Sequence, residues 1–196
     1  MRAVVLTADQ RSSRTSRDLV PDALAGLGEG ALLPFERTAG DEIQGVFTDP
    51  EAAVGAVESL LRSDTWAVGV GIGTIEDPLP DHARAGRGPA YVHAREAVER
   101  AKQVPARVAV VGDAQYRPRQ VETALWLWSA ILARRTSGGW VVADLVAEGK
   151  THHEIANQLG ISQPAVTQRA RAAGLADAGR ARQLAVELLG EALEEN

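Results

Sequence analysis

The segment from residue 162 to residue 171 carries side chains that suit the surface of a DNA duplex. Gln168 can form two hydrogen bonds with adenine, and Arg171 can reach guanine or a phosphate. Hydroxyl groups in the same segment can hold phosphate oxygens. At about 100° per residue, a helix would turn one polar face away from Val166 and Ala170. We therefore expect these DNA contacts: Ser162, Gln163, Pro164, Thr167, Gln168, Arg169 and Arg171.

Two short helices joined by a tight turn must position these side chains. Ile155 and Leu159 lie four residues apart on one face of a first helix, and Gly160 suits a turn that needs a positive φ. Ser162 is a good N-cap for the second helix, whose first turn tolerates Pro164. This spacing predicts a helix-turn-helix from 152 to 174, whose second helix enters the DNA major groove. The alternative is a helical hairpin that only packs.

Two aspartates near the N-terminus are candidate metal ligands. Asp9 ends a β-branched run that predicts a buried strand, and Asp41 follows Gly40 at the tip of a predicted hairpin. Two carboxylates at neighbouring strand ends can hold Mg²⁺, which prefers oxygen ligands and often bridges to phosphates. The alternative is that Gly40-Asp41 serves only as the hairpin turn.

The remaining periodicity of the first half predicts an α+β domain. We expect strands over 3–8, 32–38, 42–47, 66–73 and 106–111, with helices over 17–27, 50–62 and 88–103. A loop rich in proline, glycine and charged residues covers 76–88. The order β-α-β-β-α-β-α-β indicates a ferredoxin-like arrangement with one added strand.

Several motifs resemble known families. The run RTAGDEIQGVF resembles the hairpin of class III nucleotide cyclases and the GGDEF loop of diguanylate cyclases, and GVGIG resembles the strand that follows in both. GPAYVHAREAVERA is similar to a later cyclase helix. Taken together, residues 1–113 most resemble the SatD family of small bacterial proteins. In the second half, SQPAVTQ resembles the recognition helix of LysR-type regulators, and EIANQLGIS follows a frame shared by many bacterial repressors and sigma-factor domains.

The cyclase resemblance implies roles for individual residues. Asp9 and Asp41 match its two metal-binding aspartates, which implies Mg²⁺ together with a nucleotide. Arg37 stands where a purine-selecting lysine is usual, and Arg95 matches the transition-state arginine. Tyr91 stands where cyclases carry asparagine, a departure that disfavours catalysis. The resemblance therefore implies Arg37, Tyr91 and Arg95 as ligand-binding residues.

The phosphate-binding turn of cyclases is also replaced. Its position here holds the sequence QRSSR, in which Arg11, Arg14 and backbone amides can still hold a phosphate.

The second half of the chain is predicted to be helical. A long apolar helix over 118–135 is either a shaft between two domains or a dimer surface. Ser137-Gly138-Gly139 reads as a flexible break, followed by helices over 140–147 and 181–193. We expect three parts: a cyclase-like palm domain over 1–115, a connecting helix over 116–136 and an all-α helix-turn-helix domain without a winged hairpin over 137–196.

Composition limits the environment and the partners. The 196 residues include no cysteine, no apolar run near 18 residues and no signal-peptide pattern, so we expect a soluble, cytoplasmic protein without membrane contact. The net charge of −5 argues against general attraction to nucleic acid. Between Lys150 and Arg182, however, five basic residues face only two acidic ones.

These features predict a sequence-specific DNA-binding transcription regulator that acts on double-stranded DNA. Its palm domain would bind a nucleotide or another small phosphate ligand, or mediate dimerisation, and we expect a homodimer. One alternative is a metal-dependent nucleotidyl cyclase-like enzyme that carries a DNA-binding module. Another is an interaction protein whose palm has lost its ligand.

Overall fold

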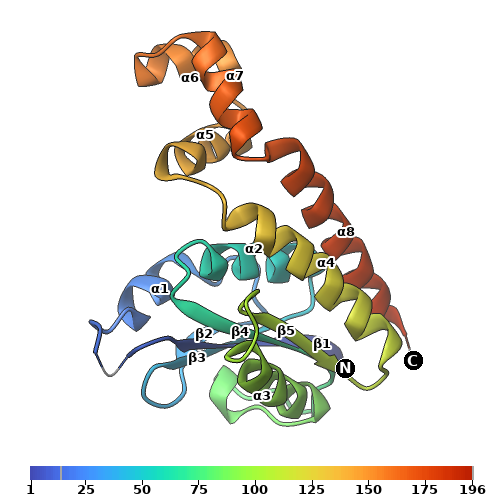
Figure 1. Cartoon of the computed structure of the whole chain (residues 1–196). Coiled ribbons are helices and arrows are strands. Elements are labelled where there is room, and N and C mark those ends of the chain that lie inside the picture. The colour runs from blue at the N-terminus through green and yellow to red at the C-terminus, as the bar shows by residue number, and fades with distance from the viewer. Residues whose placement is uncertain (14, 196) are drawn as a thin grey trace.

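The computed structural model describes residues 1–13 and 15–195 as an α+β protein with one mixed five-stranded sheet (Figure 1). The strands are β1 (Arg2–Gln10), β2 (Leu33–Arg37), β3 (Glu42–Phe47), β4 (Trp66–Thr74) and β5 (Val108–Gly112). They lie in the order β2-β3-β1-β4-β5. Strand β1 is antiparallel to both β3 and β4, whereas β5 is parallel to β4.

Eight α-helices accompany the sheet in the described part of the chain. They are α1 (Val20–Gly26), α2 (Pro50–Leu61), α3 (Pro89–Ala101), α4 (Tyr116–Leu132), α5 (Ser137–Ala147), α6 (His152–Leu159), α7 (Gln163–Ala172) and α8 (Leu175–Glu194). A single 3₁₀ turn, Ala83–Ala85, lies in the predicted loop. The predicted order of strands and helices in the first half is confirmed. The first helix is shorter than expected, and the last begins six residues earlier.

Helices cover both faces of the sheet, and alternate residues of β4 face two different sets of helices. Its residues Val68, Val70 and Ile72 join the main core, which α1, α2, α4 and α8 cover (Figure 1). The alternating residues Gly69 and Gly71 face α3 instead. A Cβ on Gly71 would lie 2.2 Å from the backbone nitrogen of Ala94. The glycines therefore let the α3 backbone rest directly on the strand.

Side chains occupy the outer edge of β5. The carboxylate of Glu122 accepts a hydrogen bond from the Val110 amide at 2.7 Å, and Arg100 donates to the Val110 carbonyl at 3.1 Å. The indole of Trp126 donates to the carbonyl of Val108 at 2.8 Å. These bonds satisfy backbone groups that an open edge strand would offer to another chain.

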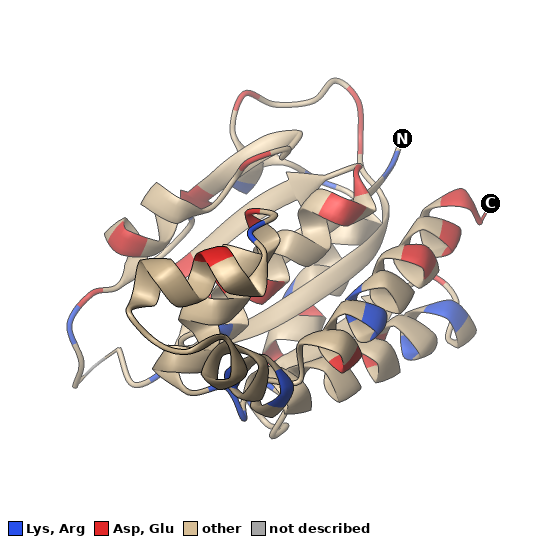
Figure 2. Ribbon diagram, turned by 90° about the horizontal axis from the view of Figure 1, so that it is seen from above, with Lys and Arg blue, Asp and Glu red and all other residues tan. Residues whose placement is uncertain are grey.

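The last helix returns to the α/β body. Helix α8 runs antiparallel to α4, and Arg117 near the start of α4 pairs with Glu191 and Glu195 near the end of α8 (Figure 1). Acidic residues gather at this end of α8 (Figure 2). Ala185 and Leu189 of α8 lie in the main core. The segment predicted as one domain, 137–196, is thus divided, because α5–α7 form a separate core and α8 joins the body.

The exposed faces of α4 and α8 carry several apolar side chains. Leu127 of α4 is 62% exposed and Leu184 of α8 is 45% exposed, whereas Trp128 is buried. Helix α4 is therefore buried against the sheet and α8 but open on its outer side. Over the described residues, no helix combines the length and apolar character needed to cross a membrane.

Candidate functional site

The two short helices α6 and α7 are fixed by their own end residues. Thr151 and Glu154 form a reciprocal capping box at the start of α6, and Gly160 ends that helix with a φ of 63°. The hydroxyl of Ser162 accepts a hydrogen bond from the Ala165 amide at the start of α7, and Pro164 lies in the first turn. The structure thus contains the two predicted short helices and the turn between them.

A small apolar core supports this pair of helices. Its buried members are Val142, Leu145, Ile155, Ala156, Val166 and Ala170, from α5, α6 and α7. The residues expected to form a flexible break instead begin α5, where Thr136 accepts a hydrogen bond from the Gly139 amide. A Cβ on Gly139 would lie 3.1 Å from the Cβ of Ala173, so glycine allows the end of α7 to come close. No strand follows β5 in the described part of the chain, as expected for a domain without a wing.

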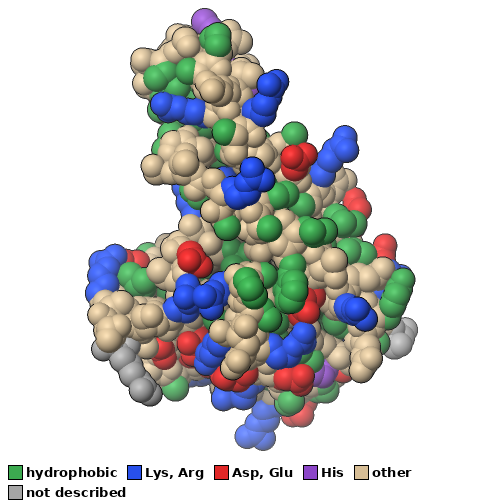
Figure 3. All heavy atoms as spheres, viewed as in Figure 1, with side chains coloured by type: hydrophobic (Ala, Val, Ile, Leu, Met, Phe, Trp, Pro, Cys, Tyr) green, Lys and Arg blue, Asp and Glu red, His purple; other side chains and the backbone are tan. Residues whose placement is uncertain are grey.

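The residues predicted to contact DNA are all exposed on or beside α7. Pro164, Gln168 and Arg171 face solvent, opposite the buried Val166 and Ala170, and Gln163 is exposed at the first position of the helix. The hydroxyl of Thr167 is already engaged, because it donates to the Gln163 carbonyl at 3.2 Å. Arg169 lies nearer to α5, with its guanidinium close to Gly138. The end of the molecule built from α6 and α7 projects from the body and carries Lys, Arg and His side chains (Figure 3).

One polar neighbour of α7 was not predicted. The Nδ1 atom of His152 lies 3.1 Å from the hydroxyl oxygen of Thr167, so the start of α6 touches the exposed face of α7. The threonine-x-x-glutamate spacing at Thr151 and Glu154 was the available signal, because a capping box fixes where the helix begins.

Asp9 and Asp41 line one hollow of about 350 Å³ at an end of the sheet. The same hollow is lined by Gln10, Arg11, Ser12, Ser13, Lys102 and Arg107. The amide of Gln10 donates to the carbonyl of Asp41 at 3.1 Å, which ties the hairpin to the end of β1. Arg14 lies outside the described residues. The predicted pair of aspartates is thus brought together, with three basic residues around it.

A lysine occupies the carboxylate of Asp9 in this hollow. The ammonium group of Lys102 is 3.0 Å from the Asp9 carboxylate and 2.8 Å from Glu99. Burial alone would lower the pKa of Lys102, but its hydrogen bonds to Glu99 and Asp9 raise that pKa, so the lysine remains charged. Within residues 1–13 and 15–195, no three histidine or acidic side chains are grouped to hold a metal ion. The three basic side chains that line the hollow, Arg11, Lys102 and Arg107, suit an anion better than a cation.

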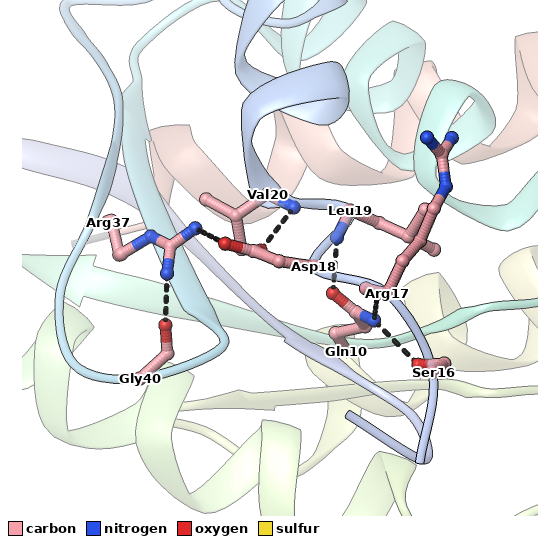
Figure 4. A network of polar contacts seen from close by, with 8 residues as sticks. All are labelled: Gln10, Ser16, Arg17, Asp18, Leu19, Val20, Arg37 and Gly40. Carbon is pink, nitrogen blue, oxygen red and sulfur yellow. Dashed lines mark hydrogen bonds and ion pairs between the residues drawn. The ribbon is translucent and has the colours of Figure 1, made fainter. Parts of the chain in front are cut away.

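Arg37 lies on the other face of the sheet. It is paired with Ile43 in the sheet and shares the face of Phe35, which belongs to the main core. Its guanidinium donates to the Asp18 carboxylate and, at 2.9 Å, to the Gly40 carbonyl (Figure 4). The hydrogen bond from Arg37 lowers the pKa of Asp18. Arg37 therefore holds the loop before α1 against the hairpin.

Tyr91 and Arg95 are also remote from the two aspartates. Tyr91 lies in the first turn of α3, eleven residues before Lys102, so at about 1.5 Å per residue the two lie about 16 Å apart along the helix. Its hydroxyl is buried against Gly86 under the 76–88 loop, and burial raises its pKa. Arg95 is exposed on α3. The structure does not gather Arg37, Tyr91 and Arg95 at one site.

No protein-family model, curated protein sequence or solved structure matches this chain. Its function must therefore be inferred from its own residues and their arrangement.

Proposed function

We propose that this protein is a sequence-specific DNA-binding transcription regulator. The observation that carries the proposal is the exposed face of α7, where Gln168 and Arg171 point away from a buried apolar core. A capped helix of this kind fits the major groove, and glutamine and arginine are side chains that read base edges there. A purely structural hairpin would not need two such side chains on its free face.

Charge around α7 supports the same proposal. The chain as a whole is acidic, with a net charge of −5, but five basic and two acidic residues lie between Lys150 and Arg182. Arg169 and Arg171 lie in the last turns of α7, and Arg180 follows in the exposed first half of α8. Such residues hold phosphates on either side of a groove and position the helix without reading sequence.

We propose that two copies of the chain act together. One helix-turn-helix covers a half-site, and dimers place two such helices about one turn of DNA apart. The exposed Leu127 and Leu184 supply apolar surface on adjacent helices. The operator would then be an inverted repeat. A particle that remains a monomer in light scattering, both free and on DNA, contradicts this part of the proposal.

We propose that the α/β body is a ferredoxin-like, SatD-type palm that senses a phosphate ligand. The antiparallel order β2-β3-β1-β4 supports this assignment, and the hollow beside Asp9 supplies Arg11, Lys102 and Arg107 for phosphate oxygens. A nucleotide with Mg²⁺ would bind only if Lys102 leaves Asp9. Calorimetry with a panel of nucleotides, with and without Mg²⁺, tests this part. Rapid product formation that Asp41→Ala abolishes would instead favour the cyclase-like enzyme.

Selection from a random duplex library tests the central proposal. The wild-type protein should enrich one motif, and Gln168→Ala should weaken binding to it by about 1–3 kcal/mol while relaxing one base position. Gln183→Ala is the matched control, because Gln183 is exposed on α8 and bonds only to Glu187. Arg171→Ala should weaken all sequences alike if it holds a phosphate. Failure to enrich any motif would contradict DNA reading by α7.

A further inference from the structure

A cleft of about 520 Å³ lies between the α/β body and the helix-turn-helix. Helix α5 lies above α2 in Figure 1. The residues that line the cleft lie on or next to α2, α4, α5 and α8. Pockets of this volume at the junction of two domains commonly hold small molecules. The cleft is separate from the hollow at Asp9 and from the exposed face of α7.

One wall of the cleft is apolar. It is built by Trp128, Ala143, Val146, Ala147, Leu175 and Ala178. The apolar body of a ligand would be removed from water against this wall, which contributes about 25 cal/mol per Å² of buried apolar surface. The cleft is therefore suited to a molecule with a hydrocarbon or aromatic part rather than to an inorganic ion.

Charged side chains also line the cleft. Arg62, Arg135 and Arg182 line it together with only two carboxylates, those of Glu58 and Asp144. Both terminal nitrogens of Arg62 already donate to the Asp144 carboxylate, at 2.8 and 2.6 Å. Arg182 is also engaged, because its Nη1 atom donates to the Glu51 carboxylate at 2.5 Å. Arg135 approaches Glu58 only at 3.6 Å, beyond hydrogen-bond distance.

Arg135 gives the cleft a guanidinium group that is already held in place for an anion. Its side chain is only 5% exposed, and its Nε atom donates to the Ala173 carbonyl at 3.1 Å. Its guanidinium also stacks 4.5 Å from the centre of the Trp140 ring. The side chain is thus fixed, while its charge is met only loosely by Glu58. An incoming carboxylate would supply the short, charge-assisted hydrogen bonds that Glu58 does not make.

We propose that this cleft binds a small organic carboxylate with an apolar body, held by Arg135 against the wall around Trp128. The ligand would touch both α2 of the body and α5, which the Arg62–Asp144 pair also joins. A ligand with different affinity for two arrangements of α5 shifts their populations. Its effect on DNA affinity rests on the proposed DNA binding, whereas the binding of the carboxylate does not.

Benzoate, 1-naphthoate and octanoate are suitable probes, with benzamide as the neutral and benzylamine as the cationic counterpart of benzoate. Titration of the full chain without DNA, followed by tryptophan fluorescence and calorimetry, should give saturable binding of at least one carboxylate at millimolar concentration. Loss of charge-assisted hydrogen bonds should make benzamide bind about tenfold more weakly than benzoate. Equal binding of benzoate and benzamide, or no saturable binding by any of the three carboxylates, overturns the proposal.

Two variants test the location. Gly179 lines the cleft with open space around its Cβ position, so Gly179→Phe should block the cleft and weaken binding about tenfold or more. Ala176→Phe is the control, because Ala176 is exposed on the same helix but does not line the cleft. Binding that survives Gly179→Phe overturns the assignment, and because no DNA is present, this failure is separate from failure of DNA binding.

Discussion

Gly71→Ala should destabilise the protein because the added methyl group has no room between β4 and α3. The new Cβ would lie 2.2 Å from both the Ala90 carbonyl oxygen and the Ala94 amide nitrogen, where 3.4–4 Å is ordinary contact. Both atoms belong to the helix backbone, so no side chain can rotate away. Helix α3 would have to shift by more than about 1 Å from a close-packed sheet, which costs about 3 kcal/mol, the upper end of overpacking.

Thermal and urea unfolding followed by circular dichroism can measure this cost. For a chain of this length, about 3 kcal/mol corresponds to a fall in Tm of about 6–12 °C. Gly179→Ala is the matched control, the same substitution at a glycine of α8 where no atom lies within 4 Å of the new Cβ. It should stabilise the protein by about 0.5–1 kcal/mol through helix propensity. A Gly71→Ala variant with wild-type Tm would show that α3 does not rest on β4 as described.

Two further predictions concern buried polar groups. Gln10→Leu should lower the free energy of unfolding in urea by about 1–3 kcal/mol, because the side-chain amide of Gln10 donates to the Ser16 hydroxyl and the Arg17 carbonyl and accepts from the Leu19 backbone amide (Figure 4). An unchanged unfolding midpoint would mean that water replaces those hydrogen bonds. Burial raises the pKa of Glu58 above its ordinary value of 4.5, more than the nearby arginines lower it. Its contribution to stability is therefore complete below about pH 4.5 and is lost as pH rises through the higher folded-state pKa. Wild type should lose stability relative to Glu58→Gln across that window, and a difference that is constant with pH would contradict the raised pKa.

The sequence by itself determines the two short helices α6 and α7 and the turn between them. Ile155, Gly160, Ser162 and Val166 act on neighbours within about four residues, through helix periodicity, a left-handed C-cap and an N-cap hydroxyl. These local interactions hardly depend on the rest of the chain. The order of strands and helices in the first half is predictable for the same reason. That Asp9 and Asp41 lie near each other at one end of the sheet also follows from the sequence, because the turn of the hairpin can be recognised.

Tertiary packing decides which other residues accompany those aspartates. Arg37 is close to Asp41 in sequence, yet the alternation of side chains along β2 directs it to the other face, toward Asp18. Lys102 reaches Asp9 only because the glycines of β4 bring α3 down onto the sheet. Neither contact has a local signal, because each depends on strand register or on the distance between a helix and a strand.

The end of the chain shows the same limit over a longer range. The apolar pattern around Leu184 and Leu188 predicts a helix but not its partner, and the structure packs it against α4 and α2. Small residues such as Ala178 and Ala185 make this contact possible without marking it in the sequence. The cleft between Glu58 and Arg182 joins residues more than a hundred positions apart. Local patterns fix each helix, whereas only the packing of whole helices decides which charged side chains meet.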